Sequence, residues 1–316
     1  MTSLVVRVGI WKYAPFKRAI LNSIEVLNSF IKNKGWDAYY ELLNISPVKG
    51  EMPTVDMVIF DGGEDINPAL YGERNLYSFY NDKRDEEETN ILRYYTALPF
   101  PRFSGVCRGH QLLNVFYGGS LWQDISKQLL GLKGVMHPSP HKVSVLKNRS
   151  LIRKELNIEK FFSQSTPFYV SSLHHQAVKN LGRGFTQSLI WTYQRAACGL
   201  NEGIENKDGN IRAVQSHPEF KNFATDGVLF SYLAHVDHFL GEFMESGAET
   251  DLSKSKMSEV LAKKELREMT QDRLMGATVD DRPELPERPR VFRLRTFEES
   301  SPSPVDPVPY DYDEDR

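Results

Sequence analysis

The sequence predicts an α/β protein with a doubly wound, mainly parallel sheet flanked by helices. The first observation is the order of elements at the start of the chain. A β-branched run at 4–10 precedes apolar residues at helical spacing over 16–31 and a second strand-like run at 36–43. The second is that apolar runs at 55–60 and 103–106 lead directly into glycine-containing loops. In an open α/β sheet, ligands bind where such loops leave the carboxyl ends of the strands.

The remaining elements extend this pattern. Residues 81–98 are acidic first and apolar later, which predicts a helix whose early carboxylates suit the helix dipole. We interpret the acidic run from Asp85 to Glu88 as solvent-exposed rather than as a metal site, since charge runs are usually exposed. Further strands are predicted at 141–146, 168–172, 185–193, 199–205 and 211–215, and a last helix at 224–240.

A cysteine lies between the strand at 103–106 and a predicted helix at 108–117. Gly105 and Gly109 stand two residues either side of Cys107 and lack the Cβ atoms that would clash in so sharp a turn, as in a nucleophile elbow. The positive end of the helix dipole favours a thiolate at this position. Taken alone, Cys107 would more often be a small buried apolar residue, which is the commoner role of a free cysteine.

A second motif favours a reactive cysteine. The strand at 211–215 leads into His217-Pro-Glu219, and residues two apart in an extended chain project to the same face. The Glu219 carboxylate is therefore able to orient the His217 imidazole. Cys107, His217 and Glu219 together supply the nucleophile, general base and orienting acid of a hydrolytic triad.

Six motifs in chain order resemble the class I glutamine amidotransferase family, and most closely its branch of stand-alone γ-glutamyl (polyamine conjugate) hydrolases, which is peptidase C26-like. The resemblance extends over residues 3–240 and implies a flavodoxin-like sheet. The motifs are Asp61-Gly-Gly-Glu-Asp-Ile-Asn-Pro68, Arg84-Asp-Glu-Glu-Glu88, Gly105-Val-Cys-Arg-Gly-His-Gln111, Gly118-Gly-Ser-Leu-Trp-Gln-Asp-Ile125, Ser172-Leu-His-His-Gln-Ala-Val178 and Gln215-Ser-His-Pro-Glu219.

The resemblance implies hydrolysis of a glutamyl amide. Cys107 would attack the γ-carbonyl to form a covalent γ-glutamyl thioester, and His217 would protonate the departing amine and then activate water. The tetrahedral intermediate needs backbone donors aimed at its oxygen. The implied donors are the N–H of Arg108 and an N–H of Gly62 or Gly63 in the glycine loop.

The resemblance also implies contacts to the substrate. Gln111, on the first turn after the cysteine, corresponds to the glutamine-site residue of the family. His174 and His175 lie in the implied pocket wall, and the sequence leaves open which of them faces the substrate. Residues 191–200 and Ser216 depart from the family pattern close to this pocket, so the identity of the amide stays open. No cofactor is expected, and histidines without regular ligand spacing predict no metal site.

Composition restricts the broad class. The chain has 316 residues, a formal net charge of −3 and two cysteines. This slightly negative net charge does not indicate a nucleic-acid-binding surface, and two cysteines are too few for a disulfide framework. No apolar run approaches the roughly 20 residues that a membrane helix needs. We therefore expect a cytoplasmic protein that binds neither nucleic acid nor membranes.

The composition also predicts two regions. We expect residues 1–245 to form a glutamine amidotransferase-like catalytic domain and residues 246–316 to form a charged, proline-rich tail. Seven of the 17 prolines follow residue 276, and no basic residue lies between Glu298 and Asp315. Such a segment buries too little apolar area to offset its ordering entropy. We expect the tail to be disordered and available to a partner.

Two other functions remain open. The chain could be a glutaminase subunit that delivers ammonia to a separate synthetase or ligase, since it contains no Gly-x-x-x-x-Gly-Lys-Ser/Thr loop of its own. It could also be an inactive scaffold that binds partners through its tail, although the intact Cys107, His217 and Glu219 argue against this. The expected small-molecule ligand is a γ-glutamyl amide or glutamine, with a synthetase partner or a homo-oligomer left open.

Overall fold

The computed structural model describes residues 3–99, 102–129, 140–146, 167–191, 199–223 and 225–245. The strands described are β1 (Leu4–Trp11), β2 (Ala38–Ile45), β3 (Met57–Phe60), β4 (Phe103–Val106), β5 (Ser120–Trp122), β6 (His141–Val145), β7 (Phe168–Val170), β8 (Ala177–Asn180), β9 (Phe185–Trp191), β10 (Leu200–Asn206) and β11 (Ile211–Val214). The α-helices are α1 (Lys17–Asn33), α2 (Asp82–Thr96), α3 (Arg108–Phe116), α4 (Ile125–Gln128), α7 (Asp226–Leu233) and α8 (Val236–Glu245), with short 3₁₀ turns η1 (Pro47–Lys49), η2 (Pro68–Tyr71) and η4 (Pro218–Phe220).

Nine strands form the main sheet, in the order β2-β1-β3-β4-β11-β10-β9-β6-β7, and β5 pairs with β8 in a small second sheet. Strands β2, β1, β3, β4 and β11 are mutually parallel. From β11 to β7 the neighbours are antiparallel. The predicted α/β class is confirmed. The first strand, helix and second strand of the chain belong to the parallel half of the sheet.

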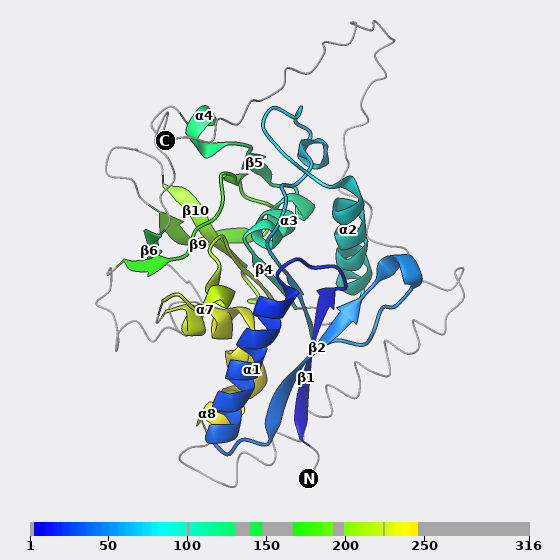
Figure 1. Ribbon diagram of the computed structural model, residues 1–316, viewed down its shortest axis with the longest axis vertical. Helices are drawn as coiled ribbons and strands as arrows, with labels where there is room; N and C mark the ends of the chain where they lie inside the picture. Colours follow the sequence, from blue (N-terminus) through cyan, green and yellow to red (C-terminus); the bar gives the residue numbers. More distant parts are fainter. Residues whose placement is uncertain are drawn as a thin grey trace, which may run out of the picture.

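Helices cover both faces of the parallel half. Neighbouring side chains on β4 show this, because successive residues of a strand point to opposite faces. The Ser104 hydroxyl donates to the carbonyl oxygen of Leu233 in α7 at 2.5 Å, whereas Gly105 faces Gly109 in α3. Figure 1 shows α1 grouped with α7 and α8, apart from α2 and α3. The predicted helical spacing is confirmed in α1, whose buried apolar residues are Ile20, Ile24, Leu27 and Ile31.

The predicted single helix at 224–240 is wrong, because two helices occupy this region. His235 lies between α7 and α8 with a φ of 51°, a left-handed conformation that ends a helix. Its buried ring contacts the Ser104 hydroxyl at 3.2 Å and Arg102 at 3.5 Å. Contacts to β4 and its flank therefore set the break.

Among the described helices, none combines the length and the apolar character needed to span a membrane. The predicted tail at 246–316 lies outside the described residues, as do Cys198 and the end of the strand predicted at 185–193.

Candidate active site

Three neighbouring parallel strands end at one edge of the sheet and carry the residues of the predicted site. β3 leads into the glycine loop 61–63, β4 into Cys107, and β11 into Gln215 and His217. Because β4 pairs with both β3 and β11, the cysteine turn lies between the other two loops. The topology thus assembles one site from segments that are far apart in the sequence.

Cys107 occupies the sharp turn between β4 and α3. Its φ of 51° and ψ of −103° are strained for a residue with a side chain, as in a nucleophile elbow. A Cβ atom on Gly105 would overlap the backbone of Gly109, and one on Gly109 would overlap the carbonyl of Phe60. The predicted need for both glycines is therefore confirmed. The cysteine side chain is buried, and its backbone N–H donates to the carbonyl of Val214 at 2.9 Å.

His217 hydrogen-bonds both Cys107 and Glu219. Its Nδ1 lies 2.8 Å from Oε1 of Glu219, and both of these side chains are buried. Because Nδ1 contacts Glu219, the other ring nitrogen, Nε2, faces the Cys107 thiol. Burial alone would lower the pKa of His217, but hydrogen bonds to Cys107 and Glu219 raise it to about 10. The imidazole is therefore protonated at neutral pH.

Close packing fixes the plane of the His217 ring. The ring stacks on Phe220 with centroids 4.8 Å apart and an interplanar angle of 5°, and Phe16 meets it edge-on at 5.6 Å. Gly62 approaches from the loop after β3, where a Cβ atom would lie 2.7 Å from Cε1 of His217. Only glycine allows the backbone of that loop to lie so close to the imidazole.

Gln215 joins Cys107 to polar groups on α3. Its Nε2 lies 3.6 Å from Sγ of Cys107, and its Oε1 accepts a hydrogen bond from Nε2 of Gln111 at 3.1 Å. His110 lies 3.1 Å from the same Oε1 and 3.0 Å from Oδ1 of Asn201. Burial lowers the pKa of His110 to about 4, so this histidine is neutral at pH 7. His110 and Gln111 thus lie in one buried hydrogen-bond network behind the cysteine.

The acidic run at the start of α2 is largely buried, so the prediction of a solvent-exposed run is wrong. Asp85 and Glu88 are at most 3% exposed, and of the charged residues around them only Glu86 and the helix start are exposed. The physical reason is two buried arginines. Arg108 forms ion pairs with Asp85 and Glu88, and Nε of Arg84 pairs with Glu88 at 3.2 Å.

Arg84 extends these ion pairs to the loop after β3. Its Nη2 donates to the Asp61 carboxylate at 2.8 Å and to the Gly62 carbonyl at 2.9 Å, and its Nη1 donates to Glu64 at 2.6 Å. Burial raises the pKa of Asp61 to about 7, although Arg84 opposes the shift. The glycine loop is thus tied to the residue that follows the cysteine. We call the following set the arginine network: Asp61, Glu64, Arg84, Asp85, Glu88 and Arg108.

The two neighbouring histidines differ in environment. The His174 side chain is 2% exposed, and its Nδ1 lies 2.8 Å from the carbonyl oxygen of Gln176. Nε2 of Gln111 reaches the same carbonyl at 3.3 Å. The His175 side chain is 47% exposed and lies 3.1 Å from Asp65, whose hydrogen bond raises the His175 pKa. His174 therefore shares a partner with Gln111, whereas His175 is at the surface.

Two features of this region were not predicted. The members of the arginine network lie within motifs of the resemblance, but nothing in those motifs indicates that they pair. The spacing of Arg84 and Glu88 at i and i+4 also occurs on exposed helix faces. The buried pair His141 and Glu202 had no sequence signal, because the two residues come from separate strands.

A buried cysteine at a strand-to-helix turn, facing a histidine and a glutamate at the end of the neighbouring parallel strand, defines a protein of the class I glutamine amidotransferase type. The sequence model of the Peptidase C26 family matches residues 40–219. The chain belongs to the Peptidase C26 family, which consists of hydrolase-type enzymes.

Two relatives with similar sequences agree with this assignment. A Lactococcus lactis protein with the provisional name glutamine amidotransferase-like protein YvdE is 36% identical over 179 residues, which are 54% of this chain and 69% of the relative. A Schizosaccharomyces pombe protein provisionally named as a glutamine amidotransferase is 36% identical over 171 residues, which are 53% of this chain and 63% of the relative. Among solved structures, the Trypanosoma brucei CTPS glutaminase domain with bound acivicin aligns with a TM-score of 0.48 and 14% identity, over 75% of this chain and 94% of the other.

Proposed function

We propose that the protein hydrolyses a γ-glutamyl amide through a covalent thioester on Cys107. The Cys107 sulfur attacks the γ-carbonyl carbon, and the carbonyl oxygen becomes an oxyanion. His217 gives its proton to the departing amine as the C–N bond breaks. Water then attacks the thioester, its proton passes to His217, and glutamate and the free thiolate are released.

The observation that carries this proposal is the connected set Cys107, His217 and Glu219. The three side chains are buried, the histidine hydrogen-bonds both partners, and its pKa is raised to about 10. A protonated histidine beside a cysteine suits the breakdown step, which needs an acid for a poor amine leaving group. Glu219 fixes the ring orientation in which Nε2 faces the sulfur.

The proposed oxyanion donors are the N–H of Arg108 and an N–H of the Gly62-Gly63 loop. Arg108 is the first residue of α3, where backbone N–H groups lack intrahelical acceptors. Gly62 packs against His217, and Gly63 has a φ of 140° that side chains rarely adopt. Ion pairs through Arg84 and Glu88 connect the two donor segments, which supports a preorganised site.

For the substrate we propose contacts from Gln111 and His174, with His175 at the outer rim. The buried position of His174 and the carbonyl that it shares with Gln111 support this order. We place a γ-glutamyl-amine conjugate ahead of glutamine as the substrate, because the motif around Ser172 to Gln176 resembles the stand-alone hydrolase branch.

The test is to incubate pure protein with glutamine and with a panel of γ-glutamyl amines while measuring glutamate release. Cys107→Ala should abolish turnover of every accepted amide, because no thioester can form. Cys198→Ala, which changes the other cysteine of the chain, is the matched control and should retain activity. Full activity in Cys107→Ala would rule out this mechanism.

A second function, glutaminase activity that supplies ammonia to a separate synthetase, is favoured by the amidotransferase names of the relatives. It predicts slow hydrolysis of glutamine by the pure chain and a rise in rate when the partner is present. Rapid turnover of a γ-glutamyl amine without any partner would decide for the stand-alone hydrolase.

A further inference from the structure

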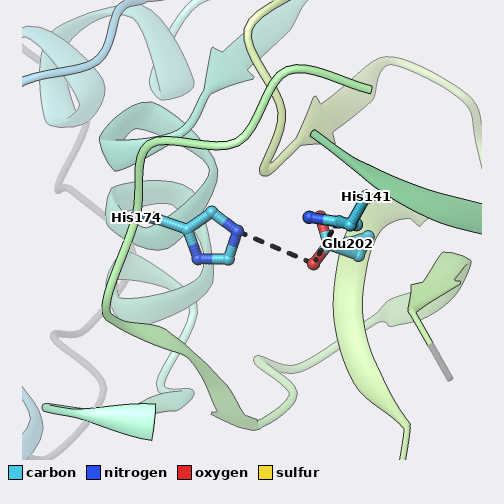
Figure 2. A group of neighbouring side chains, drawn as sticks. All are labelled: His141, His174 and Glu202. Carbon is cyan, nitrogen blue, oxygen red and sulfur yellow. Dashed lines mark ion pairs between the residues drawn. The ribbon is translucent and has the colours of Figure 1, made fainter. Parts of the chain in front are cut away.

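A second buried group of ionisable side chains shares no residue with the proposed triad. His141 on β6, Glu202 on β10 and His174 before β8 converge from three segments of the chain, as Figure 2 shows. Nε2 of His141 lies 3.2 Å from Oε1 of Glu202, and Nε2 of His174 lies 3.6 Å from the same oxygen. Each of the three side chains is at most 2% exposed.

The hydrogen bond on the far side of His174 defines which nitrogen faces the group. The carbonyl oxygen of Gln176 only accepts, so the contact at 2.8 Å requires a hydrogen on Nδ1 of His174. In the neutral ring, Nε2 therefore presents its lone pair to Glu202. A divalent cation between the three side chains would accept this lone pair and balance the charge of the Glu202 carboxylate.

We propose that His141, His174 and Glu202 bind a divalent transition-metal ion, with Zn²⁺ as the best match. One ligand atom from each residue lies within 4.8 Å of the other two. Ligands at about 2.0–2.1 Å around tetrahedral zinc are separated by roughly 3.3 Å, which small side-chain rotations reach from these positions. Two imidazoles and one carboxylate are a common zinc donor set, with a fourth position open for water.

The surroundings of His174 match those of metal-ligating histidines. Such histidines usually donate their second ring N–H to a carbonyl or carboxylate, and that bond fixes the tautomer. The Gln176 carbonyl fills this role. The ion would tie the segment before β8 to strands β6 and β10, and thereby hold the loop that carries His174 against the main sheet. The proposed zinc site uses none of Cys107, His217 and Glu219, but it includes His174, which we also propose as a substrate contact. Its test therefore measures zinc binding directly and does not depend on turnover.

The test measures zinc directly. Protein without a polyhistidine tag is treated with a chelator, desalted, titrated with Zn²⁺ by calorimetry and analysed for metal content. We expect one tightly bound Zn²⁺ per chain. Glu202→Gln keeps the side-chain volume but removes the charge, and should weaken binding at least about 100-fold, since loss of an outer-shell partner alone costs 10–100-fold.

His175→Gln is the matched control, because it changes the adjacent, exposed histidine that contacts Asp65. It should bind Zn²⁺ as the wild type does. Co²⁺ loaded into wild-type protein should give the visible spectrum of a four-coordinate nitrogen and oxygen site, and Glu202→Gln should lose that spectrum while its circular dichroism stays native. Absence of Zn²⁺ uptake by folded wild-type protein, or equal uptake by Glu202→Gln, would overturn the proposal.

Discussion

At the scale of single residues, the contact between Glu219 and His217 determines when the imidazole is an acid. The His217 pKa of about 10 depends on hydrogen bonds to Cys107 and Glu219 that outweigh the effect of burial. Loss of the Glu219 charge should therefore lower this pKa. It should also weaken the hydrogen bond that keeps Nε2 of His217 towards the sulfur.

The first prediction concerns Glu219→Gln. We expect kcat/KM to fall by up to ~10⁴-fold, the loss found when the orienting acid of the serine-protease triad becomes an amide. The alkaline limb of the pH profile should lie near pH 10 in the wild type and move to lower pH in the variant. Steady-state rates between pH 6 and 11 measure both effects. An unchanged profile would mean that another carboxylate orients His217.

The second prediction concerns stability and pH. The folded-state pKa of His217 is raised above its ordinary value of 6.5, so its contribution to stability is fully present below about pH 6.5. The contribution is lost as the pH rises towards 10. The free energy of unfolding of wild type minus that of His217→Gln should therefore shrink between pH 6 and pH 9.5. Urea unfolding of both proteins measures the difference, and a constant difference would contradict the assigned protonation.

At the scale of elements, the arginine network connects α2, the loop after β3 and the start of α3. Removing one partner of a buried ion pair leaves an uncompensated charge and costs about 3–5 kcal/mol. The third prediction is therefore that Glu88→Gln destabilises the fold by roughly this amount, because it pairs with both Arg84 and Arg108. Urea unfolding measures the loss.

Glu86→Gln is the matched control for Glu88→Gln, since Glu86 lies on the same helix and is exposed. Its free energy of unfolding should change by less than ~0.5 kcal/mol. Similar losses in both variants would mean that charge on α2, rather than the buried pairs, stabilises this region.

The fourth prediction concerns the packing of α3 on the sheet. A methyl group on Gly109 would overlap the backbone carbonyl of Phe60, so Gly109→Ala should cost at least ~1–3 kcal/mol and disturb the cysteine turn. Gly227→Ala in α7 meets no atom within 4 Å and should be neutral or slightly stabilising. Thermal unfolding and labelling of Cys107 report both effects. Equal melting temperatures would place α3 further from β3 than described.

Local sequence patterns were sufficient for some elements and not for others. The strand, helix, strand opening and the cysteine turn were predictable, because β-branched runs, helical spacing and paired glycines are local signals. The break between α7 and α8 at His235 was not predictable from the sequence, because His235 contacts Arg102 and Ser104 in a distant segment. The burial of Glu88 likewise depends on Arg108, which reaches α2 only in the folded protein.

At the scale of the whole molecule, the proposed triad combines residues that follow two neighbouring parallel strands. Cys107 follows β4 and His217 follows β11, and these two strands pair although the antiparallel strands of the main sheet lie between them in the sequence. The spacing of the motifs could predict which residues meet. It could not predict the cluster of His141, His174 and Glu202, which depends on the pairing of β6 with β9 and of β9 with β10.

The fifth prediction concerns the extent of the catalytic domain, which we propose to be residues 1–245. A chain ending at Glu245 should fold and hydrolyse the accepted amide at the full-length rate, since the motifs all lie before that residue. Rates of both chains are compared with and without cell lysate. A rate that rises with lysate only in the full-length protein would assign the tail to a partner and favour the glutaminase function.

The central claim, a γ-glutamyl thioester on Cys107, is tested most directly by mass spectrometry of acid-quenched enzyme. Protein mixed with an accepted γ-glutamyl amide is quenched within the first turnover, and the intact mass and peptide map are measured. We predict a γ-glutamyl adduct on Cys107 that is absent from Cys107→Ala. It should also fail to form when His217 is replaced by glutamine, because His217 protonates the departing amine. Turnover without any adduct on Cys107, or an adduct on another residue, would contradict it.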